Sequence, residues 1–299
     1  MYYQPRRTLG LLVGAVLASW SAAIGVLLVN AGLTAGTGLA QLAAYGGGAL
    51  AATLALLFCY WCYGLATLAY RVDRNGLVIE FGTTRQVIPL DAIERLVPER
   101  SLGAVPRVRG ISWPGCHIGR ADLDRIGEVL VYSAHQSPEQ LLYVMTSART
   151  YALSVEDPTR FAEEIQRRQR LGPTAVVTHR AERWGIPAQS LWHDRRALVL
   201  LAVALACALA MWAQVAIRYP DLPAALDIIF PPGADPGHLT LVERSALLEL
   251  PRVATALLVI NLAIGALAHG RSRAASHVLF LAAAGAQLAL LAAFAVAVA

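Results

Sequence analysis

The sequence predicts an α+β membrane protein: a five-span α-helical bundle with an antiparallel β-barrel inserted between the second and third spans. Two observations predict this. Only 15% of the 299 residues are charged, against about a quarter in soluble proteins. The deficit is uneven, because residues 8–70, 197–217 and 253–268 contain no charged side chain. Residues 71–172 carry charges and include short segments that alternate apolar and polar side chains, as half-buried strands do.

The apolar runs are long enough to cross a membrane. About 18 apolar residues cover a hydrocarbon layer of roughly 30 Å. The predicted spans lie at about 9–30, 42–69, 197–217, 253–269 and 277–298. The first run is too long for a signal peptide, and the second exceeds one span, which predicts tilt or a protruding end. The fourth run is short, so whether it spans fully stays open.

The distribution of arginine predicts the topology. Basic residues are enriched in short cytoplasmic segments beside membrane spans. Residues 71–196 carry 18 Arg against 15 Asp plus Glu, whereas 218–252 carries three Arg against five acidic residues. The N-terminus and residues 71–196 are therefore predicted to be cytoplasmic, and the C-terminus extracytoplasmic. All 25 basic residues are arginine, which argues against chemistry that needs a lysine.

The inserted segment contains short apolar runs separated by turn residues, which are typical of strands. Asn75–Gly76 is a hairpin turn signal before the first run. We expect a polar loop over Arg100–Asp124. The predicted strands are GLVIEFG (76–82), RQVIPL (85–90), AIERLVPE (92–99), EVLVYSA (128–134), QLLYVMTS (140–147) and TYALSV (150–155).

An amphipathic helix is predicted after the last strand. Asp157 is a good helix cap, and Pro158 suits the first helical position. Phe161 and Ile165 lie four residues apart and therefore share one face. Such a helix can close the open end of a small barrel.

Two stretches resemble a known family. The pattern Y-x-V-x-x-N-G-L-V-I-x-x-G-x-x-x-x-x-I-P-L-x-x-I over 70–93, and YALSVEDPTRFAEEI over 151–165, are similar to bacterial pleckstrin-homology (PH)-like domains. The resemblance implies a curled sheet capped by its last helix, in a protein of the bacterial inner (cell) membrane. Residues 218–275 are similar to an uncharacterised bacterial multi-span membrane domain. Neither family has an established catalytic role, so the resemblance implies architecture more than activity.

The predicted domain order follows from these segments. Two N-terminal transmembrane helices (1–70) precede the cytoplasmic PH-like domain (71–172). A basic and aromatic juxtamembrane linker (173–196) leads to three further transmembrane helices (197–299), which include the extracytoplasmic loop at about 218–252.

Arginines near the first hairpin are interpreted as lipid and interface anchors. Eukaryotic PH domains bind phosphoinositides through basic residues at this place. Here Arg71, Arg74 and Arg85 are interrupted by Asp73 and Glu80, which favours simple anchoring, worth about 1 kcal/mol per residue near an anionic surface. The other predicted anchors are Trp184, Trp192, Arg195 and Arg196.

A second basic group lies in or beside the predicted loop. Arg107, Arg109 and Arg120 occur together with Asp122 and Asp124. They form either a solvated loop or a protein-contact patch, and the sequence leaves both interpretations open.

No catalytic, metal or cofactor site is predicted. Cys59 and Cys62 have C-x-x-C spacing but lie inside the second span, without a second pair. His269 and His277 lie near span ends, where histidines are usually solvated. No charged residue occurs in the middle of a span, so a conducting pathway is poorly supported.

The sequence therefore predicts a non-catalytic adaptor or accessory subunit whose PH-like domain binds a protein, less readily a lipid. Its expected partners are the bilayer and another membrane or membrane-proximal protein, with no nucleic acid. Small residues at 43–52 and 282–293 favour close helix packing, either within the chain or onto that partner. The alternatives are a small-solute transporter and a membrane enzyme of unknown chemistry.

Overall fold

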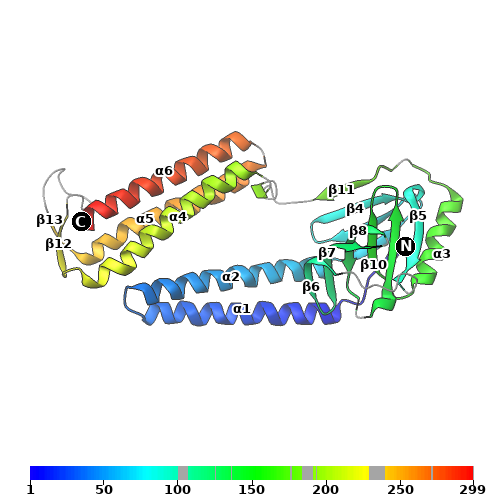
Figure 1. Cartoon of the computed structure of the whole chain (residues 1–299), viewed down its shortest axis with the longest axis horizontal. Helices are drawn as coiled ribbons and strands as arrows, with labels where there is room; N and C mark the ends of the chain where they lie inside the picture. Colours follow the sequence, from blue (N-terminus) through cyan, green and yellow to red (C-terminus); the bar gives the residue numbers. More distant parts are fainter. Residues whose placement is uncertain are drawn as a thin grey trace. The chain divides into compact units, whose positions relative to one another are not determined.

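The structure is a computed structural model that divides the chain into two compact units. One unit comprises residues 1–23 and 51–184, and the other comprises 24–50 and 185–299. Figure 1 labels the helices and strands. The described residues are 1–99, 107–124, 126–135, 137–175, 177–183, 191–192, 194–228, 240–270 and 272–298.

Five helices among the described residues are long and apolar enough to cross a membrane. This confirms the number predicted from the apolar runs, and the chain is a multi-pass membrane protein. The fourth helix begins at Glu249, four residues before the predicted span, and its 21 residues cover about 30 Å. The five helices are α1 (Thr8–Thr34), α2 (Leu39–Ala66), α4 (Arg195–Arg218), α5 (Glu249–His269) and α6 (Arg273–Val298).

The first sheet has five strands in the order β1-β2-β3-β4-β11, and all of its ladders are antiparallel. Three of these strands are not predicted. β1 precedes α1, β2 begins at the end of the predicted second span, and β11 lies in the segment predicted as a juxtamembrane linker. The sheet therefore includes strands that lie before and after the predicted domain in the sequence. Its strands are β1 (Tyr2–Tyr3), β2 (Ala69–Val72), β3 (Gly76–Phe81), β4 (Thr84–Pro89) and β11 (Arg180–Arg183).

The second sheet has six strands in the order β5-β9-β10-β8-β7-β6. β8 and β10 pair in parallel, so the prediction of a wholly antiparallel arrangement is wrong at this ladder. It is parallel because β9 pairs with β10 and returns the chain to run beside β8 in the same direction. No ladder among the described residues closes the two sheets into one barrel. The strands are β5 (Ile93–Pro98), β6 (Arg109–Trp113), β7 (Cys116–Leu123), β8 (Gly127–Ser133), β9 (Leu141–Thr146) and β10 (Thr150–Ser154).

The predicted loop at 100–124 is wrong from Arg109 onward, because β6 and β7 form a hairpin there. Their turn contains Pro114 and Gly115, and Gly115 has φ 79°, a left-handed conformation that favours glycine. Residues 100–106 lie outside the described part of the chain.

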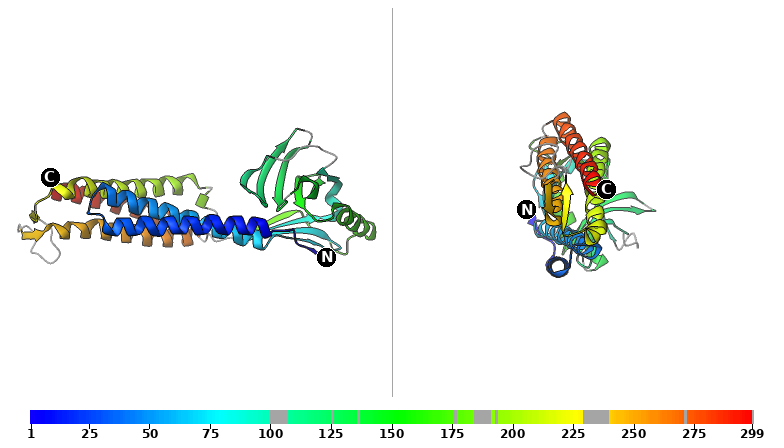
Figure 2. Two further views of the ribbon diagram at one scale, coloured as in Figure 1. Left: turned by 90° about the horizontal axis from the view of Figure 1, so that it is seen from below. Right: turned by 90° about the vertical axis from the view of Figure 1, so that its left-hand side faces the viewer.

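The two sheets and α3 (Pro158–Leu171) enclose one apolar core (Figure 2). The prediction for α3 is confirmed. The Asp157 carboxylate accepts the N–H of Arg160 at 2.9 Å, and Phe161 and Ile165 are fully buried. α3 therefore closes one end of the core.

The Tyr70 hydroxyl joins the two sheets inside this core. Tyr70 lies on β2, and its hydroxyl donates to the Tyr132 carbonyl on β8 at 2.6 Å. The same oxygen accepts the N–H of Ser154 on β10 at 3.2 Å. Burial raises the pKa of Tyr70 to about 12, so this hydroxyl keeps its proton at physiological pH.

The end of α2 is part of the same core. Leu65 and Leu68 are fully buried among the core residues. The Gly82 N–H donates to the Thr67 hydroxyl at 2.7 Å, which ties the β3–β4 turn to the end of the helix. The folded domain therefore begins within the last turn of α2, before the predicted boundary at residue 71.

The β6–β7 turn packs against both N-terminal helices. Trp113 donates its indole N–H to the Gly10 carbonyl on α1 at 3.0 Å. The Trp113 ring also lies 6.2 Å from Phe58 and 5.9 Å from Trp61 on α2, measured between ring centroids. A side chain at Gly10 would collide with the Gly115 carbonyl. Glycine at this position thus allows the turn to reach the helix backbone.

The other unit contains the bundle of α4, α5 and α6, together with a hairpin of β12 (Ala225–Ile228) and β13 (Thr240–Glu243). Small residues make up most of one of its core clusters, in which Leu258 packs with Ala204, Ala208, Ala283 and Ala284. In the same unit, Gly47 and Gly48 lie against Leu28 and Val29 of α1. Internal packing therefore uses small residues from both predicted runs.

We expect Leu68→Ala to lower the free energy of unfolding of the β-rich unit by about 2–5 kcal/mol, because it leaves a cavity in a well-packed core. Leu56→Ala, on α2, is the matched control, since Leu56 is 73% exposed. Pulse proteolysis in increasing urea measures both. Equal stabilities of the two variants would contradict the placement of Leu68 in the core.

Candidate functional site

The three predicted anchoring arginines near the first hairpin are engaged within the protein. Arg71 pairs with Glu80 at 3.1 Å, and Arg85 lies 3.7 Å from both Glu80 and Glu182. Arg74 donates to the Leu171 carbonyl at 3.0 Å and to the Gly172 carbonyl at 3.1 Å. Two of these side chains thus neutralise acids on the first sheet, and Arg74 satisfies carbonyls at the end of α3.

The second basic group lies at an edge of the six-stranded sheet. Arg109 on β6 stands directly opposite Arg120 on β7, and Arg107 lies two residues before the start of β6. Arg120 pairs with Glu128 at 3.5 Å. Arg107 and Arg109 are exposed and have no ion pair among the residues the structure describes. The structure therefore places these arginines on and beside an edge strand rather than in a long loop.

The remaining predicted anchors flank α4. Trp192 is 70% exposed, and Arg195 and Arg196 are exposed in the first turn of the helix. An exposed aromatic ring beside basic residues at the start of a span is typical of a membrane interface. Trp184 lies outside the described residues.

A polar cluster that the sequence analysis missed lies on β6, β7 and β8. The rings of His117 and His135 stack with centroids 4.3 Å apart. Ser112 hydrogen-bonds to Nδ1 of His117 at 3.1 Å, and Ser133 to Nδ1 of His135 at 2.6 Å. Burial, followed by the neighbouring His117, lowers the pKa of His135 to about 4. Burial also lowers the pKa of His117, so both rings favour the neutral form.

The cysteines are free thiols, and Cys116 is buried. Burial raises the pKa of the Cys116 thiol to about 12, which leaves it protonated and unreactive at neutral pH. Among the described residues, no group of three His, Cys, Asp or Glu side chains is arranged to hold a metal ion.

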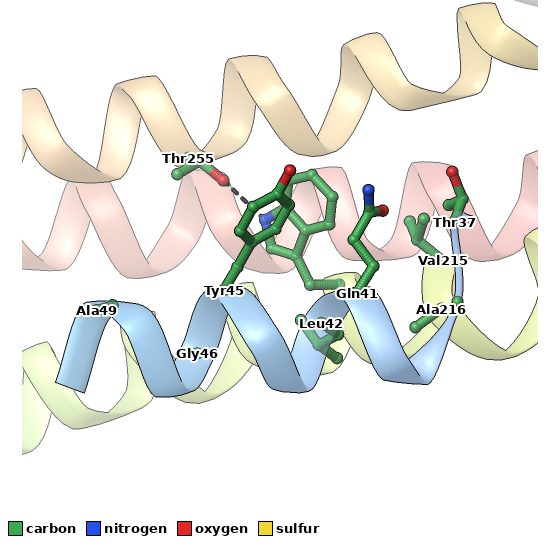
Figure 3. A pocket seen from close by; sticks show the side chains of 11 residues that line it. Thr37, Gln41, Leu42, Tyr45, Gly46, Ala49, Val215, Ala216 and Thr255 are labelled. Atoms are coloured by element: carbon green, nitrogen blue, oxygen red, sulfur yellow. Dashed lines mark hydrogen bonds between the residues drawn. The ribbon is translucent and has the colours of Figure 1, made fainter. Parts of the chain in front are cut away.

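A mainly apolar pocket of about 370 Å³ lies in the second unit (Figure 3). The start of α2 contributes Gln41 and Tyr45, and the bundle contributes Trp212 and Thr255, which hydrogen-bond to each other at 2.9 Å. Gln41 donates to the Gly32 carbonyl at 3.1 Å. None of the described lining residues is Asp, Glu, Arg, Lys or His, so the pocket presents no charge to a solute.

The ends of the bundle helices hold another cluster that differs from expectation. His269 is 2% exposed, although a histidine at a span end is expected to be solvated. Its Nδ1 is hydrogen-bonded to the hydroxyl of Ser276, at 3.0 Å. His277 hydrogen-bonds to Asp194 at 2.8 Å. The burial arises because α4, α5 and α6 bring these ends together, which no local sequence pattern indicates.

A comparison with protein families identifies the β-rich segment. Residues 68–169 match the family model of the bacterial PH domain. The match begins at the buried Leu68 and ends within the last turn of α3, so the PH-like domain includes β2 to α3. β1 and β11 lie outside it. No match was found among curated proteins or among solved structures.

We expect acid to destabilise the PH-like domain through His135. Its folded-state pKa of about 4 lies below the ordinary 6.5, so the unfolded chain takes up the proton first as pH falls. The free energy of unfolding should therefore decrease between about pH 6.5 and about pH 4, by up to roughly 3 kcal/mol.

The measurement is the urea midpoint of the domain against pH, by pulse proteolysis. His135→Asn should flatten the profile, because asparagine keeps a hydrogen-bonding group near Ser133 but does not titrate. A profile as steep in His135→Asn as in the original chain would refute this assignment.

Proposed function

We propose that the chain is a non-catalytic membrane adaptor or accessory subunit, in which the PH-like domain binds a protein partner close to the bilayer. The observation that carries the proposal is the shared core of the domain and the end of α2, through Leu65 and Leu68. Because the domain shares its core with the end of a membrane-spanning helix, it stays close to the membrane. Its accessible partners are therefore membrane proteins or proteins at the membrane surface.

The distribution of arginines favours a protein over a specific lipid headgroup. A phosphoinositide pocket needs several free basic groups around the first hairpin. Arg71 and Arg85 share Glu80, and Arg74 is bonded to the end of α3. The exposed Arg107 and Arg109 beside an edge strand offer charge to an acidic protein surface instead.

We further propose that the two sheets and α3 correspond to the capped β-barrel of PH domains, with β1 and β11 as additions to one sheet. The proposed location is the bacterial inner membrane. The arginine distribution supports a cytoplasmic N-terminus, a cytoplasmic segment 71–196 and an extracytoplasmic C-terminus.

The alternatives have weaker support. A small-solute transporter would be favoured by a titratable acid, base or histidine in a cavity between spans, and the pocket at Tyr45 and Trp212 has none among its described lining residues. A membrane enzyme would be favoured by a reactive thiol or a bound cofactor. The buried, protonated thiol of Cys116 does not favour this activity.

The double variant Arg107→Glu/Arg109→Glu should no longer co-elute with the partner protein, because the reversed charges repel an acidic surface. The full chain is purified in mild detergent, and co-eluting proteins are quantified by mass spectrometry. Arg167→Glu/Arg170→Glu makes the same charge change at two exposed positions of α3 and should retain the partner. Equal loss from both variants, or no loss from either, would argue against the edge of β6 as the contact.

Protease added to inside-out membrane vesicles should cleave the segment 71–196, whereas protease added to intact spheroplasts should not. In the vesicles, immunoblotting of a tag at the C-terminus reports the cleavage. In spheroplasts, where the proposed orientation exposes that tag, its loss checks the opposite side, and an antibody against 71–196 reports whether the segment stays intact. Cleavage of 71–196 from outside the spheroplast would reverse the proposed orientation.

A further inference from the structure

The outer edge of β4 is covered by a short strand that lies outside the PH-like domain. β11 is the last strand of the first sheet and pairs antiparallel with β4, with Glu182 opposite Arg85 and Arg180 opposite Val87 (Figure 1). The match to the bacterial PH family ends at residue 169, before β11 begins. On this side of the sheet the matched strands therefore end at β4, and the chain covers that edge with an added strand.

β11 is held mainly by its main chain. No side chain is buried between residues 177 and 182, where Arg180 and Ala181 are exposed and Glu182 is half-buried. Main-chain hydrogen bonds between strands do not depend on which side chains the strands carry. Another extended chain can therefore make the same bonds, because removal of β11 leaves the N–H and C=O groups of β4 ready to pair.

Two polar contacts give this edge a chemical preference. The Glu182 carboxylate lies 3.7 Å from the guanidinium of Arg85 on β4. Three residues earlier, Nε2 of His179 is hydrogen-bonded to the hydroxyl of Tyr151 on β10, at 2.8 Å. A strand that occupies this edge is therefore stabilised by an acid opposite Arg85 and by a hydrogen-bonding side chain beside Tyr151.

The chain before β11 is anchored separately, on the turn between β2 and β3. The side-chain oxygen of Asn75 accepts the N–H groups of Thr174 at 2.8 Å and Ala175 at 3.1 Å, and the Thr174 hydroxyl at 2.9 Å. Arg74 bonds to the carbonyls at the end of α3. β11 can therefore leave β4 while residues 171–175 stay in place. A strand tethered this closely competes with a free strand at an effective concentration on the order of millimolar.

We propose that the outer edge of β4 is a second interaction surface, separate from the basic edge at β6. It accepts an extended segment of another protein that places an acid opposite Arg85, and β11 is the built-in competitor for this surface. When the partner's segment pairs with β4, residues 177–183 are released. The proposal does not depend on whether Arg107 and Arg109 contact a partner.

The test uses a fluorescently labelled synthetic peptide of residues 177–183 and the full chain in nanodiscs, with binding followed by fluorescence anisotropy. In Ala181→Pro/Glu182→Pro the tethered strand cannot complete its ladder, because one of two successive N–H groups faces β4 and proline has none. This variant should bind the peptide about tenfold more tightly than the original chain, since the competitor is removed. Equal affinity for the two chains, or no binding to the proline variant, would overturn the proposal.

The preference for an acid is tested with a second peptide that carries the change Glu182→Arg. It should bind the proline variant about threefold more weakly than the first peptide, because like charges then face each other across the strands. Equal binding of the two peptides would contradict the role of Arg85.

A further variant keeps the test decisive if the proline variant does not fold. Arg85→Glu repels the tethered Glu182 and should reverse the order, so that the Glu182→Arg peptide binds more tightly than the first. Failure of the order to reverse would overturn the acid preference. Two differently tagged copies of the chain are also purified together. Co-purification of the original copies that is lost in the proline variant would assign this edge to a second copy and overturn its assignment to another protein.

Discussion

The direct continuation of α2 into β2 is the constraint on which the β-rich unit depends. An α-helix is a stiff element, since bending it breaks hydrogen bonds along the backbone. Leu65 and Leu68 are buried in the domain core, and Thr67 is bonded to the β3–β4 turn. The β6–β7 turn makes a second contact through Trp113 and Gly10. The domain is thus held at two separate places on the helices, which restrains rotation as well as separation.

Charge pairing within the domain determines which of its surfaces remain available. Glu80 lies between Arg71 and Arg85 on one sheet, so the basic residues closest to the first hairpin present little free charge. At the edge of the other sheet, Arg109 and Arg120 stand opposite each other, and Glu128 pairs with Arg120. Like charges on adjacent strands are unfavourable unless something compensates them. An acidic partner surface would supply that compensation.

The sequence predicts features that depend on local pattern and misses those that depend on tertiary contact. The spans follow from missing charges, and α3 follows from Asp157, Pro158 and its two buried apolar residues. The β6–β7 hairpin is missed because Gly110 and Gly119, which pair with each other, are typical of loops. β1 has two residues and β11 has four, too few to show a period. Similarly, nothing local indicates that His269 is buried.

The two buried histidine clusters show how surroundings determine the role of one residue type. His135 stacks on another imidazole, and no acid among the described residues forms an ion pair with it. A charge there would be poorly solvated and repelled, so the fold favours the neutral ring. Acid therefore opposes folding at the first site. His269 is instead buried near the carboxylate of Asp194 and hydrogen-bonds to Ser276. The difference in surroundings arises from one carboxylate at the start of α4, whose other oxygen is already held by the helix it caps.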